Sequence, residues 1–350
     1  KLRIKQSDVN DCELMMFDHL IVFDQLHHKL CLIINARAQD GRAGYDKAVA
    51  ELDAFAETIR ITEPIPYERP LPAPAFTCNL SREEYCRIVE KTKHYIREGD
   101  IFQGVISRRF EADYDGSLLN AYRVLRTTNP SPYMYYIQLK DMQIAGTSPE
   151  TMVKLTGRKL MTFPVAGTRK RGKDREEDMA LEKELLADEK ECAEHNMLVD
   201  LARNDIGRIA EYGSVKVEDY MTVHHFSKVM HIVSVVTGKL AAGRNCLDTV
   251  EALLPAGTLS GAPKFRACEI IDELEPVPRG VYGGAIGYLD FSGNLDVCIA
   301  IRTAVRKGKK VYVQAGGGIV ADSIPESEYL ESANKAGAVI EAIRRVEEFC

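Results

Sequence analysis

Residues 282–315, YGGAIGYLDFSGNLDVCIAIRTAVRKGKKVYVQA, contain the pattern that decides the fold. Apolar residues alternate with small or polar ones in three runs, at 282–290, 295–305 and 310–315. The segments 292–294 (Ser-Gly-Asn) and 306–309 are short and have the composition of turns. Strand-like runs joined by such short turns pair in an antiparallel manner. We therefore predict an antiparallel meander of three strands.

Helices and strands are also predicted on the N-terminal and C-terminal sides of this meander. They are strands at 15–23 and 30–35 and helices at about 45–60, 81–97, 181–202 and 325–348. Ser81 with Glu84, and Ser323 with Glu326, have the spacing of helix-opening capping boxes. The Pro-rich stretch 64–74 is typical of an extended connector. The whole pattern predicts an α+β fold of mostly antiparallel sheets with covering helices.

Composition narrows the class of protein. A chain of 350 residues with 45% hydrophobic residues can bury the cores of roughly two domains. Its net charge of −6 argues against a nucleic-acid partner, and no apolar run approaches the about 20 residues of a membrane helix. Nine scattered cysteines without CxxC spacing are typical of a reducing compartment. The first residues do not resemble a signal peptide, and we expect a cytoplasmic protein. Because the sequence lacks an initiator Met and starts in a polar stretch, we expect it to be part of a longer chain.

Two predicted helices carry acidic residues three positions apart. Glu191 and Glu194 share one face of the first, and Glu328, Glu331 and Lys335 form a stripe along the last. Each pattern alone is also typical of a solvated acidic surface. If the two helices face each other, their carboxylates suit Mg²⁺, which prefers oxygen ligands. Together they indicate a magnesium site.

Two further features suit an anionic ligand. Gly316, Gly317 and Gly318 follow a predicted strand, and such a run lets the backbone approach a ligand and point N–H groups at it. A tight turn is the alternative. Arg302 lies among small neighbours on the face of its strand away from the core, where it can bind a carboxylate in a bidentate fork. A surface arginine on an edge strand is the alternative. Residues 255–264 lack phosphate-loop spacing, so no nucleotide site is expected.

Several motifs, in this order, resemble those of chorismate-utilising enzymes. They are TSPE (147–150), PVAGTR (164–169), KECAEH (190–195), VDLARND (199–205), GTLSGAPK (257–264), RGVYGG (279–284), AGGGI (315–319) and PESE (325–328). Their order and spacing match that family from about residue 81 to the end. The segment DCELMMFD (11–18) also resembles the large chain, component I, of anthranilate synthases.

This resemblance implies a fold and an activity. The fold has two sub-lobes around the active site. Residues 1–76 would be part of an N-terminal anthranilate synthase region with a Pro-rich connector, and residues 77–350 the chorismate-binding catalytic domain. The activity would be that of an Mg²⁺-dependent lyase of tryptophan biosynthesis, which converts chorismate and ammonia to anthranilate and pyruvate.

Two positions bear on the nucleophile. Relatives that make aminodeoxychorismate usually carry a lysine where this chain has Ala166, and relatives that add water typically use a lysine base where it has Gln103. The resemblance therefore points to ammonia. Aminodeoxychorismate synthase and an isochorismate- or salicylate-type synthase are the alternatives within the family. A non-catalytic tryptophan-sensing or scaffold subunit is the alternative from another class.

The resemblance also implies roles for individual residues. Catalytic residues would be Glu150, as general acid for the departing ring hydroxyl, and His231 and Thr258, which line the reacting ring. The pattern alone makes His231 a satisfied core histidine. The substrate would be held by Gly167, Thr168, Tyr282, Arg302, Gly316, Gly317, Gly318 and Lys335. Glu194 and Glu331 would bind Mg²⁺ directly, with Glu191 and Glu328 close by or through water.

Regulation and partners follow from the same resemblance. Pro132, Tyr133 and Met134 match half of the family's tryptophan feedback site. The Leu-Leu-Glu-Ser motif of the other half is absent, so we expect weak or absent tryptophan inhibition. No cysteine lies in a Gly-x-Cys-x-Gly nucleophile motif. The implied source of ammonia is therefore a separate glutamine amidotransferase subunit, component II.

Overall fold

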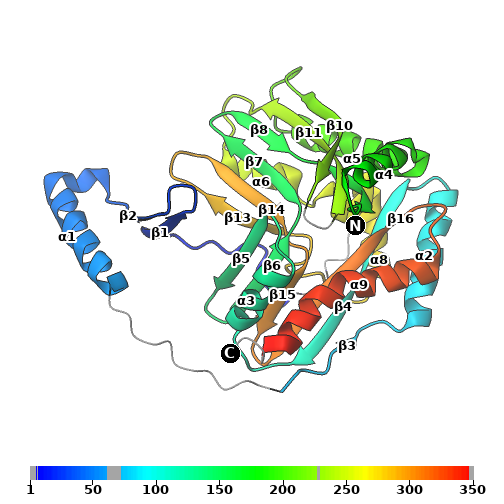
Figure 1. Ribbon diagram of the computed structural model, residues 1–350, viewed down its shortest axis with the longest axis horizontal. Coiled ribbons are helices and arrows are strands. Elements are labelled where there is room, and N and C mark those ends of the chain that lie inside the picture. The colour runs from blue at the N-terminus through cyan, green and yellow to red at the C-terminus, as the bar shows by residue number, and fades with distance from the viewer. Residues whose placement is uncertain (1–4, 6, 61–71, 227–228, 347–350) are drawn as a thin grey trace. The chain divides into compact units, whose positions relative to one another are not determined.

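The computed structural model describes Lys5 and residues 7–60, 72–226 and 229–346 (Figure 1). Contacts divide the chain into one unit of residues 1–9 and 70–350 and a second of residues 10–69. The second unit contains an antiparallel hairpin and a helix: β1 (His19–Asp24), β2 (Lys29–Ile34), the short 3-10 helix η1 (Ala38–Asp40) and α1 (Gly41–Arg60). The predicted connector at 64–74 lies largely outside the described residues.

The larger unit contains two sheets and the helices that cover them. The strands of the first sheet are β3 (Thr77–Cys78), β4 (Gln103–Asp113), β5 (Tyr133–Gln138), β6 (Met142–Ser148), β12 (Gly261–Ala262), β15 (Thr303–Lys307) and β16 (Lys310–Ile319). Those of the second are β7 (Thr151–Thr156), β8 (Lys159–Thr162), β9 (Val165–Lys170), β10 (Lys216–His225), β11 (Val229–Lys239), β13 (Ala285–Leu289) and β14 (Leu295–Ile299). The helices are α2 (Arg82–Arg97), α3 (Leu118–Thr128), α4 (Arg175–Ala187), α5 (Glu189–Gly207), α6 (Cys246–Leu253), α7 (Gly257–Ser260), α8 (Lys264–Leu274) and α9 (Pro325–Arg344).

Strand order explains how the sheets are assembled. The first sheet runs β12-β4-β16-β15-β6-β5, with β3 beside β4, and the second runs β10-β11-β8-β7-β14-β13, with β9 beside β11. Each of these pairings is antiparallel. The α+β prediction, with mostly antiparallel sheets and covering helices, is confirmed.

Apolar cores hold the helices to the sheets. Helices α3 and α9 lie on the first sheet (Figure 1), where Leu125, Val313 and Val339 share one core. Helices α2 and α8 pack against β4 in a second core that includes Tyr85 and Ile106. The second sheet packs on α5 and α6 through a core that contains Ile206, Val236 and Leu253. The two sheets meet in a further cluster that contains Ile144, Ile286 and Cys298.

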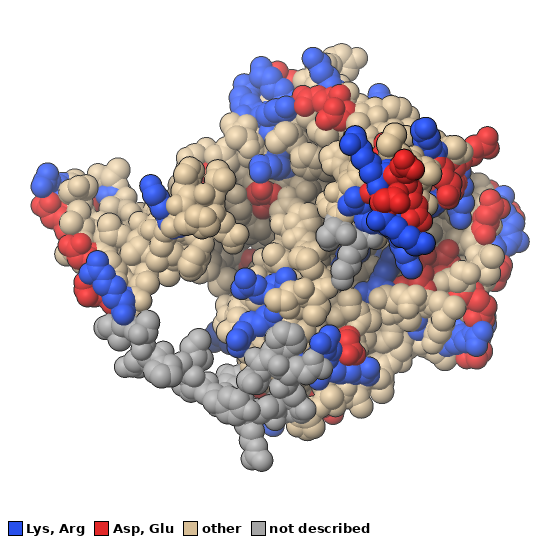
Figure 2. All heavy atoms as spheres, in the orientation of Figure 1, with Lys and Arg blue, Asp and Glu red and all other residues tan. Residues whose placement is uncertain are grey.

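The surface of the described residues is mixed in charge. On the face shown in Figure 2, Lys and Arg side chains are interspersed with Asp and Glu. The cysteines within the described ranges are free thiols. None of the helices in the described part of the chain combines the length and the apolar character needed to cross a bilayer.

The prediction of one continuous strand at 295–305 is wrong. Strand β14 belongs to the second sheet and β15 to the first, so the chain crosses between sheets at residues 300–302. Arg302 has φ +50°, a left-handed conformation that is uncommon for a residue with a side chain, and it redirects the backbone. The small neighbours of Arg302, predicted to lie on the face away from the core, are Cys298, Ala300 and Ala304. All three are at most 1% exposed, because both faces of β14 and β15 pack against other residues at this crossing.

The predicted helix at 181–202 is two helices, α4 and α5. Asp188 ends the first and caps the second, and its carboxylate accepts hydrogen bonds from the amides of Lys190 and Glu191 at 3.1 and 3.2 Å. An aspartate at this position satisfies amides that lack helical partners. The break places Glu191 and Glu194 in the first turns of α5, where an N-terminal dipole favours negative charge.

One predicted capping box is confirmed and the other is wrong. Ser81 accepts from the Glu84 amide at 3.2 Å, and the Ser81 amide donates to Glu84 Oε2 at 2.8 Å. Helix α9 instead begins after Ile324, which provides no side-chain cap. The Ser323 hydroxyl accepts from the amide of Val320, in the loop before the helix. Helix α9 ends at Arg344, and the predicted end at 348 lies outside the described residues.

Replacing Ser81 with Ala is expected to lower the free energy of unfolding by about 1 kcal/mol, because the Glu84 amide loses its acceptor. Thermal and urea unfolding followed by circular dichroism measure the change. The matched control is Ser292→Ala in an exposed turn, where no change is expected. Equal stabilities of the two variants would contradict the assigned cap.

Candidate active site

Glutamates from α5 and α9 come within electrostatic range of one another. Glu191 and Glu194 lie near the start of α5, and Glu328 and Glu331 near the start of α9. Partial burial raises the pKa of Glu194, and the charges of Glu191 and Glu331 raise it further. Partial burial likewise raises the pKa of Glu328, and Glu331 adds to this effect. Glu194 and Glu331 nevertheless keep much of their surface accessible to solvent, so this acidic group lies at the edge of the protein interior rather than in a core.

Two cations partly offset this acidic group. Lys335 Nζ lies 2.6 Å from Glu331 Oε1 and donates to the carbonyl oxygen of Gly316 at 3.2 Å. Arg169 Nη1 lies 3.4 Å from Glu191 Oε1. Over the described ranges, no three or more His, Cys, Asp or Glu side chains form a preassembled metal-binding group. The donor chemistry nevertheless fits Mg²⁺, because a divalent cation relieves carboxylate repulsion and needs only a few protein oxygens besides waters and substrate.

The glycine run lies inside a strand and not in a turn after it. Gly316, Gly317 and Gly318 belong to β16 and pair with Ser107, Ile106 and Val105 of β4, so the predicted strand end at 315 is wrong. A Cβ atom on Gly317 would lie 2.9 Å from Glu328 Oε2. A Cβ on Gly316 would lie 2.1 Å from the backbone oxygen of Ile106. Glycine is therefore required at position 316 for β16 to approach β4, whereas a side chain at position 317 would only displace the end of the Glu328 side chain.

Tyr282 lies against this strand. The Gly316 backbone hydrogen-bonds the Tyr282 hydroxyl, and burial raises the pKa of that hydroxyl, with Glu150 acting in the same direction. The Gly316 amide is thus engaged by Tyr282, and its carbonyl by Lys335. The structure brings Tyr282, Gly316, Glu150 and Lys335 into one neighbourhood.

His231 adjoins Gly167 and Thr168 through the pairing of β9 with β11. His231 Nδ1 lies 3.0 Å from the Gly167 carbonyl oxygen and 3.0 Å from Thr168 Oγ1. Burial lowers the pKa of His231, and the nearby Arg302 lowers it further. The carbonyl contact assigns a proton to Nδ1, so Nε2 remains as the acceptor of a neutral ring.

Arg302 is a cation without a carboxylate at ion-pairing distance among the described residues. Burial lowers the pKa of its guanidinium, and its charge acts on His231. A partly buried guanidinium without a counterion is suited to bind an anion. The alternative of an exposed arginine on an edge strand is wrong.

Glu150 and Thr258 line a common pocket with Pro164, Gly257 and Ile299, with an empty volume of about 440 Å³ that includes open solvent. Burial raises the pKa of Glu150, while Thr258 and Lys335 act to lower it. Thr258 Oγ1 is buried and lacks a well-formed hydrogen bond. A carboxyl with a raised pKa beside an unsatisfied hydroxyl can deliver a proton into this pocket.

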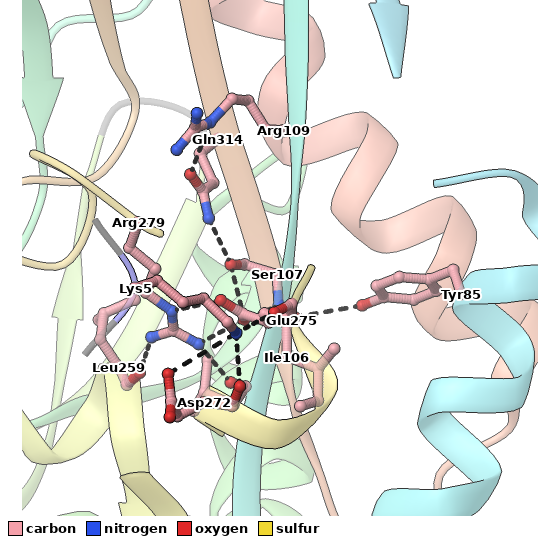
Figure 3. Close-up of polar contacts among 11 residues, drawn as sticks. Lys5, Tyr85, Ile106, Ser107, Arg109, Leu259, Asp272, Glu275, Arg279 and Gln314 are labelled. Carbon is pink, nitrogen blue, oxygen red and sulfur yellow. Dashed lines mark hydrogen bonds and ion pairs between the residues drawn. The ribbon is translucent and has the colours of Figure 1, made fainter. Parts of the chain in front are cut away.

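The ion pair of Arg279 with Glu275 was not predicted from the sequence. Arg279 is partly buried and donates to the carboxylate of the buried Glu275 at 2.6 and 2.8 Å (Figure 3). It donates to the Val105 carbonyl oxygen at 2.7 Å. It also donates to the carbonyl oxygen of Leu259, the residue after Thr258. The separation of four residues between Glu275 and Arg279 was a usable signal, but their burial was not visible in the pattern.

The predicted tryptophan-binding residues Pro132, Tyr133 and Met134 lie at the start of β5, and the contacts of Tyr133 are with the second sheet. Tyr133 and Met134 begin β5, and Tyr133 Oη donates to Asp296 Oδ1 at 2.7 Å. The Tyr133 hydroxyl also lies 2.9 Å from Thr151 Oγ1. These hydrogen bonds hold Tyr133 between the two sheets. The neighbouring Met134 is instead 41% exposed to solvent.

Comparison with known proteins identifies related chains. Residues 2–341 match the family described as chorismate binding enzyme. The chain is 49% identical to anthranilate synthase component 1 of Acetivibrio thermocellus over 346 residues, which are 97% of this chain and 70% of that protein. It is 47% identical to the Aquifex aeolicus (strain VF5) protein of the same name over 347 residues, 97% of this chain and 69% of that one. The crystal structure of anthranilate synthase component I from Streptococcus pneumoniae TIGR4 is similar with a TM-score of 0.84 and 44% identity, and the match covers 93% of this chain and 72% of that chain.

Replacing Gly316 with Ala is expected to lower the free energy of unfolding by about 1–3 kcal/mol, because the new methyl group collides with the backbone of β4. The control is Gly337→Ala in α9, where nothing lies within 4 Å of the added Cβ. There a small gain of up to about 1 kcal/mol is expected from helix propensity. Urea unfolding of both variants measures the difference, and a fully stable Gly316→Ala protein would contradict the close approach.

Proposed function

We propose a function from one premise: the chain belongs to the chorismate binding enzyme family and is similar to its anthranilate synthase component 1 members over nearly its whole length. It acts as an anthranilate synthase component I and converts chorismate and ammonia to anthranilate, pyruvate and water. The observation that carries this proposal is the 49% identity over 97% of the chain.

The choice of ammonia as nucleophile is supported by two residues. Ala166 lies in β9 opposite Ile232, next to His231, and supplies no amine for covalent attack. Gln103 Oε1 is buried without a hydrogen-bond partner. The nitrogen of the same side-chain amide, Nε2, lies against Gly318. A glutamine is not a base at neutral pH, so it does not activate water as a lysine would. Because the chain supplies neither a nucleophilic lysine at position 166 nor a lysine base at position 103, these two residues support ammonia as the nucleophile.

The substrate is proposed to bind to Arg302 and Lys335 and to lie along the glycines of β16. Chorismate carries two carboxylates, and Arg302 can bind one of them through two parallel hydrogen bonds. Lys335, held at the Gly316 carbonyl, lies within electrostatic range of Glu150 and contributes a second positive charge. Gly317 leaves the space between β16 and Glu328 open.

Magnesium would be held by Glu194 and Glu331, with Glu191 and Glu328 close by. When bound, the ion supplies Lewis acidity toward the carboxylate on the substrate ring. Partial burial raises the pKa values of Glu194 and Glu328, and the neighbouring carboxylates add to the shift, so a cation held here would stabilise the charged form of both side chains.

Proton transfers are assigned to two side chains. As the nitrogen of ammonia adds to the ring, Glu150 in its protonated form donates a proton to the departing hydroxyl, which leaves as water. Neutral His231 then accepts at Nε2 the proton that the ring loses when pyruvate is eliminated and the ring becomes aromatic. Thr258 orients Glu150 within their common pocket.

The partner proposal follows from the relatives' designation as component 1. A glutamine amidotransferase subunit supplies ammonia, since this chain lacks a Gly-x-Cys-x-Gly nucleophile motif. Pro132, Tyr133 and Met134, where Tyr133 donates a hydrogen bond to Asp296, would form half of a tryptophan feedback site. Because the Leu-Leu-Glu-Ser motif of the other half is absent, we expect tryptophan to inhibit this chain weakly or not at all.

The direct test of the proposed function is the fluorescence of anthranilate formed from chorismate, ammonium salt and Mg²⁺. We expect product with all three components and its loss on addition of EDTA. Chromatography of the mixture separates the family alternatives: aminodeoxychorismate, isochorismate or salicylate as the product would refute the assignment. Full activity in EDTA would refute the metal requirement alone.

Glu150→Gln is expected to lower kcat by about 10²–10⁴-fold, the contribution of a positioned general acid. In the native enzyme the active form is protonated Glu150, so kcat/KM should fall as pH rises through the raised pKa of this carboxyl. The Gln variant should lose this limb of the pH profile. Glu150→Asp, which keeps the acid, is the control and should retain the limb. An unchanged profile in Glu150→Gln would assign the acid to another group.

A further inference from the structure

A second pocket lies over β4, β15 and β16, with an empty volume of about 610 Å³ that includes open solvent. Its lining includes Arg109 of β4, Tyr312 and Gln314 of β16, Val305 of β15 and Val281. None of these residues lines the pocket around Glu150 and Thr258, although Tyr282, which lies beside Gly316 in the candidate active site, also lines this second pocket. We propose that this second pocket binds a small monocarboxylate with an apolar body.

The charge of Arg109 is the first support. Burial lowers the pKa of this guanidinium. It donates to the Pro278 carbonyl oxygen and, at 3.4 Å, to Gln314 Oε1, and its Cζ lies 5.4 Å from the centre of the Tyr312 ring. Among the residues that the structure describes, no carboxylate comes within 4.0 Å of it. The charges of Asp8, Glu111 and Glu275 act to raise its pKa, but none of these carboxylates is in contact with the guanidinium. A partly buried cation whose direct contacts are neutral acceptors is stabilised by an incoming anion.

The other charged groups around the pocket have counterions. Arg279 is paired with Glu275 at 2.6 Å. Lys307 Nζ lies 3.9 Å from Asp8 Oδ2 and 3.9 Å from Asp141 Oδ2. Arg109 is therefore the cation whose charge is left for a ligand, and a ligand with one negative charge suits it.

A hydrogen-bonded chain fixes the geometry around Arg109 (Figure 3). Gln314 Nε2 donates to Ser107 Oγ at 2.8 Å, and Ser107 Oγ donates to Glu275 Oε1 at 2.8 Å. Glu275 is in turn held by Arg279. This chain directs the oxygen of Gln314, rather than its nitrogen, toward Arg109. The guanidinium is thus positioned before any ligand binds, which favours affinity.

The walls of the pocket define the rest of the ligand. Val9, Val281 and Val305 are partly buried apolar residues that line it and pack on one core cluster. The Tyr312 ring beside Arg109 adds a flat surface. A carboxylate on Arg109 would leave an aliphatic or aromatic body against these residues. Benzoate has this chemistry and is a suitable probe.

The test is isothermal titration calorimetry of the whole chain with sodium benzoate. We expect binding that weakens by about tenfold or more in Arg109→Gln, the loss of a charge-assisted bidentate contact. Gln314→Glu is a nearly isosteric second variant. It places a carboxylate beside Arg109 and should weaken benzoate binding to a similar degree. If circular dichroism shows that Arg109→Gln is unfolded, the benzoate affinity of Gln314→Glu tests the proposal in its place.

A matched control separates this pocket from the substrate site. Arg302→Gln removes the guanidinium proposed to bind chorismate. Because benzoate also resembles the anthranilate product, this variant is allowed to lose a separate binding event at the substrate site, but the event that depends on Arg109 should remain with unchanged affinity. Benzoate binding that is lost in Arg302→Gln but kept in Arg109→Gln or Gln314→Glu would overturn the proposal, as would the absence of any binding to the native chain at millimolar benzoate. Neither outcome bears on anthranilate formation, so the two proposals fail separately.

Discussion

Repulsion between carboxylates that two distant segments bring together is the constraint on which the site depends. The charge of Glu331 in α9 raises the pKa of Glu194 in α5, although the two residues lie far apart in sequence. Lys335 and Arg169 offset part of this repulsion by pairing with Glu331 and Glu191. Like charges at short range oppose folding unless a cation or a substrate relieves them, so other contacts must hold the two helices in place.

Those contacts are apolar, and they belong to different sheets. Val339 of α9 packs in the core of the first sheet, and Val199 of α5 packs in the core of the second. The distance between the acidic groups is therefore set by how the sheets meet. They meet where the chain leaves β14 and enters β15, at Arg302. The crossing thus places a cation between the sheets, and the same residue is proposed to bind substrate.

A buried polar network supports the strands behind this site. Arg279 and Glu275 form an ion pair and bind the backbone of β4 and of the segment that carries Thr258 (Figure 3). Removing one partner of such a pair leaves an uncompensated buried charge, which is more costly than the pair is stabilising. Ser107 extends the network to Gln314, so the pocket at Arg109 and the neighbourhood of Thr258 share one support.

The sequence by itself determined the fold class, the capping box at Ser81, the family motifs and the acidic spacing of Glu191 with Glu194 and of Glu328 with Glu331, since these depend on local periodicity and residue order. It did not reveal the break at Asp188, the crossing at Arg302 or the glycines' position within β16. Alternation along one strand is the same whether a strand stays in one sheet or passes to another, and a glycine run is compatible with a turn or a close-packed strand. Only the tertiary structure decided these, because pairing with β4 and burial on both sides of a strand arise from residues far away in the chain.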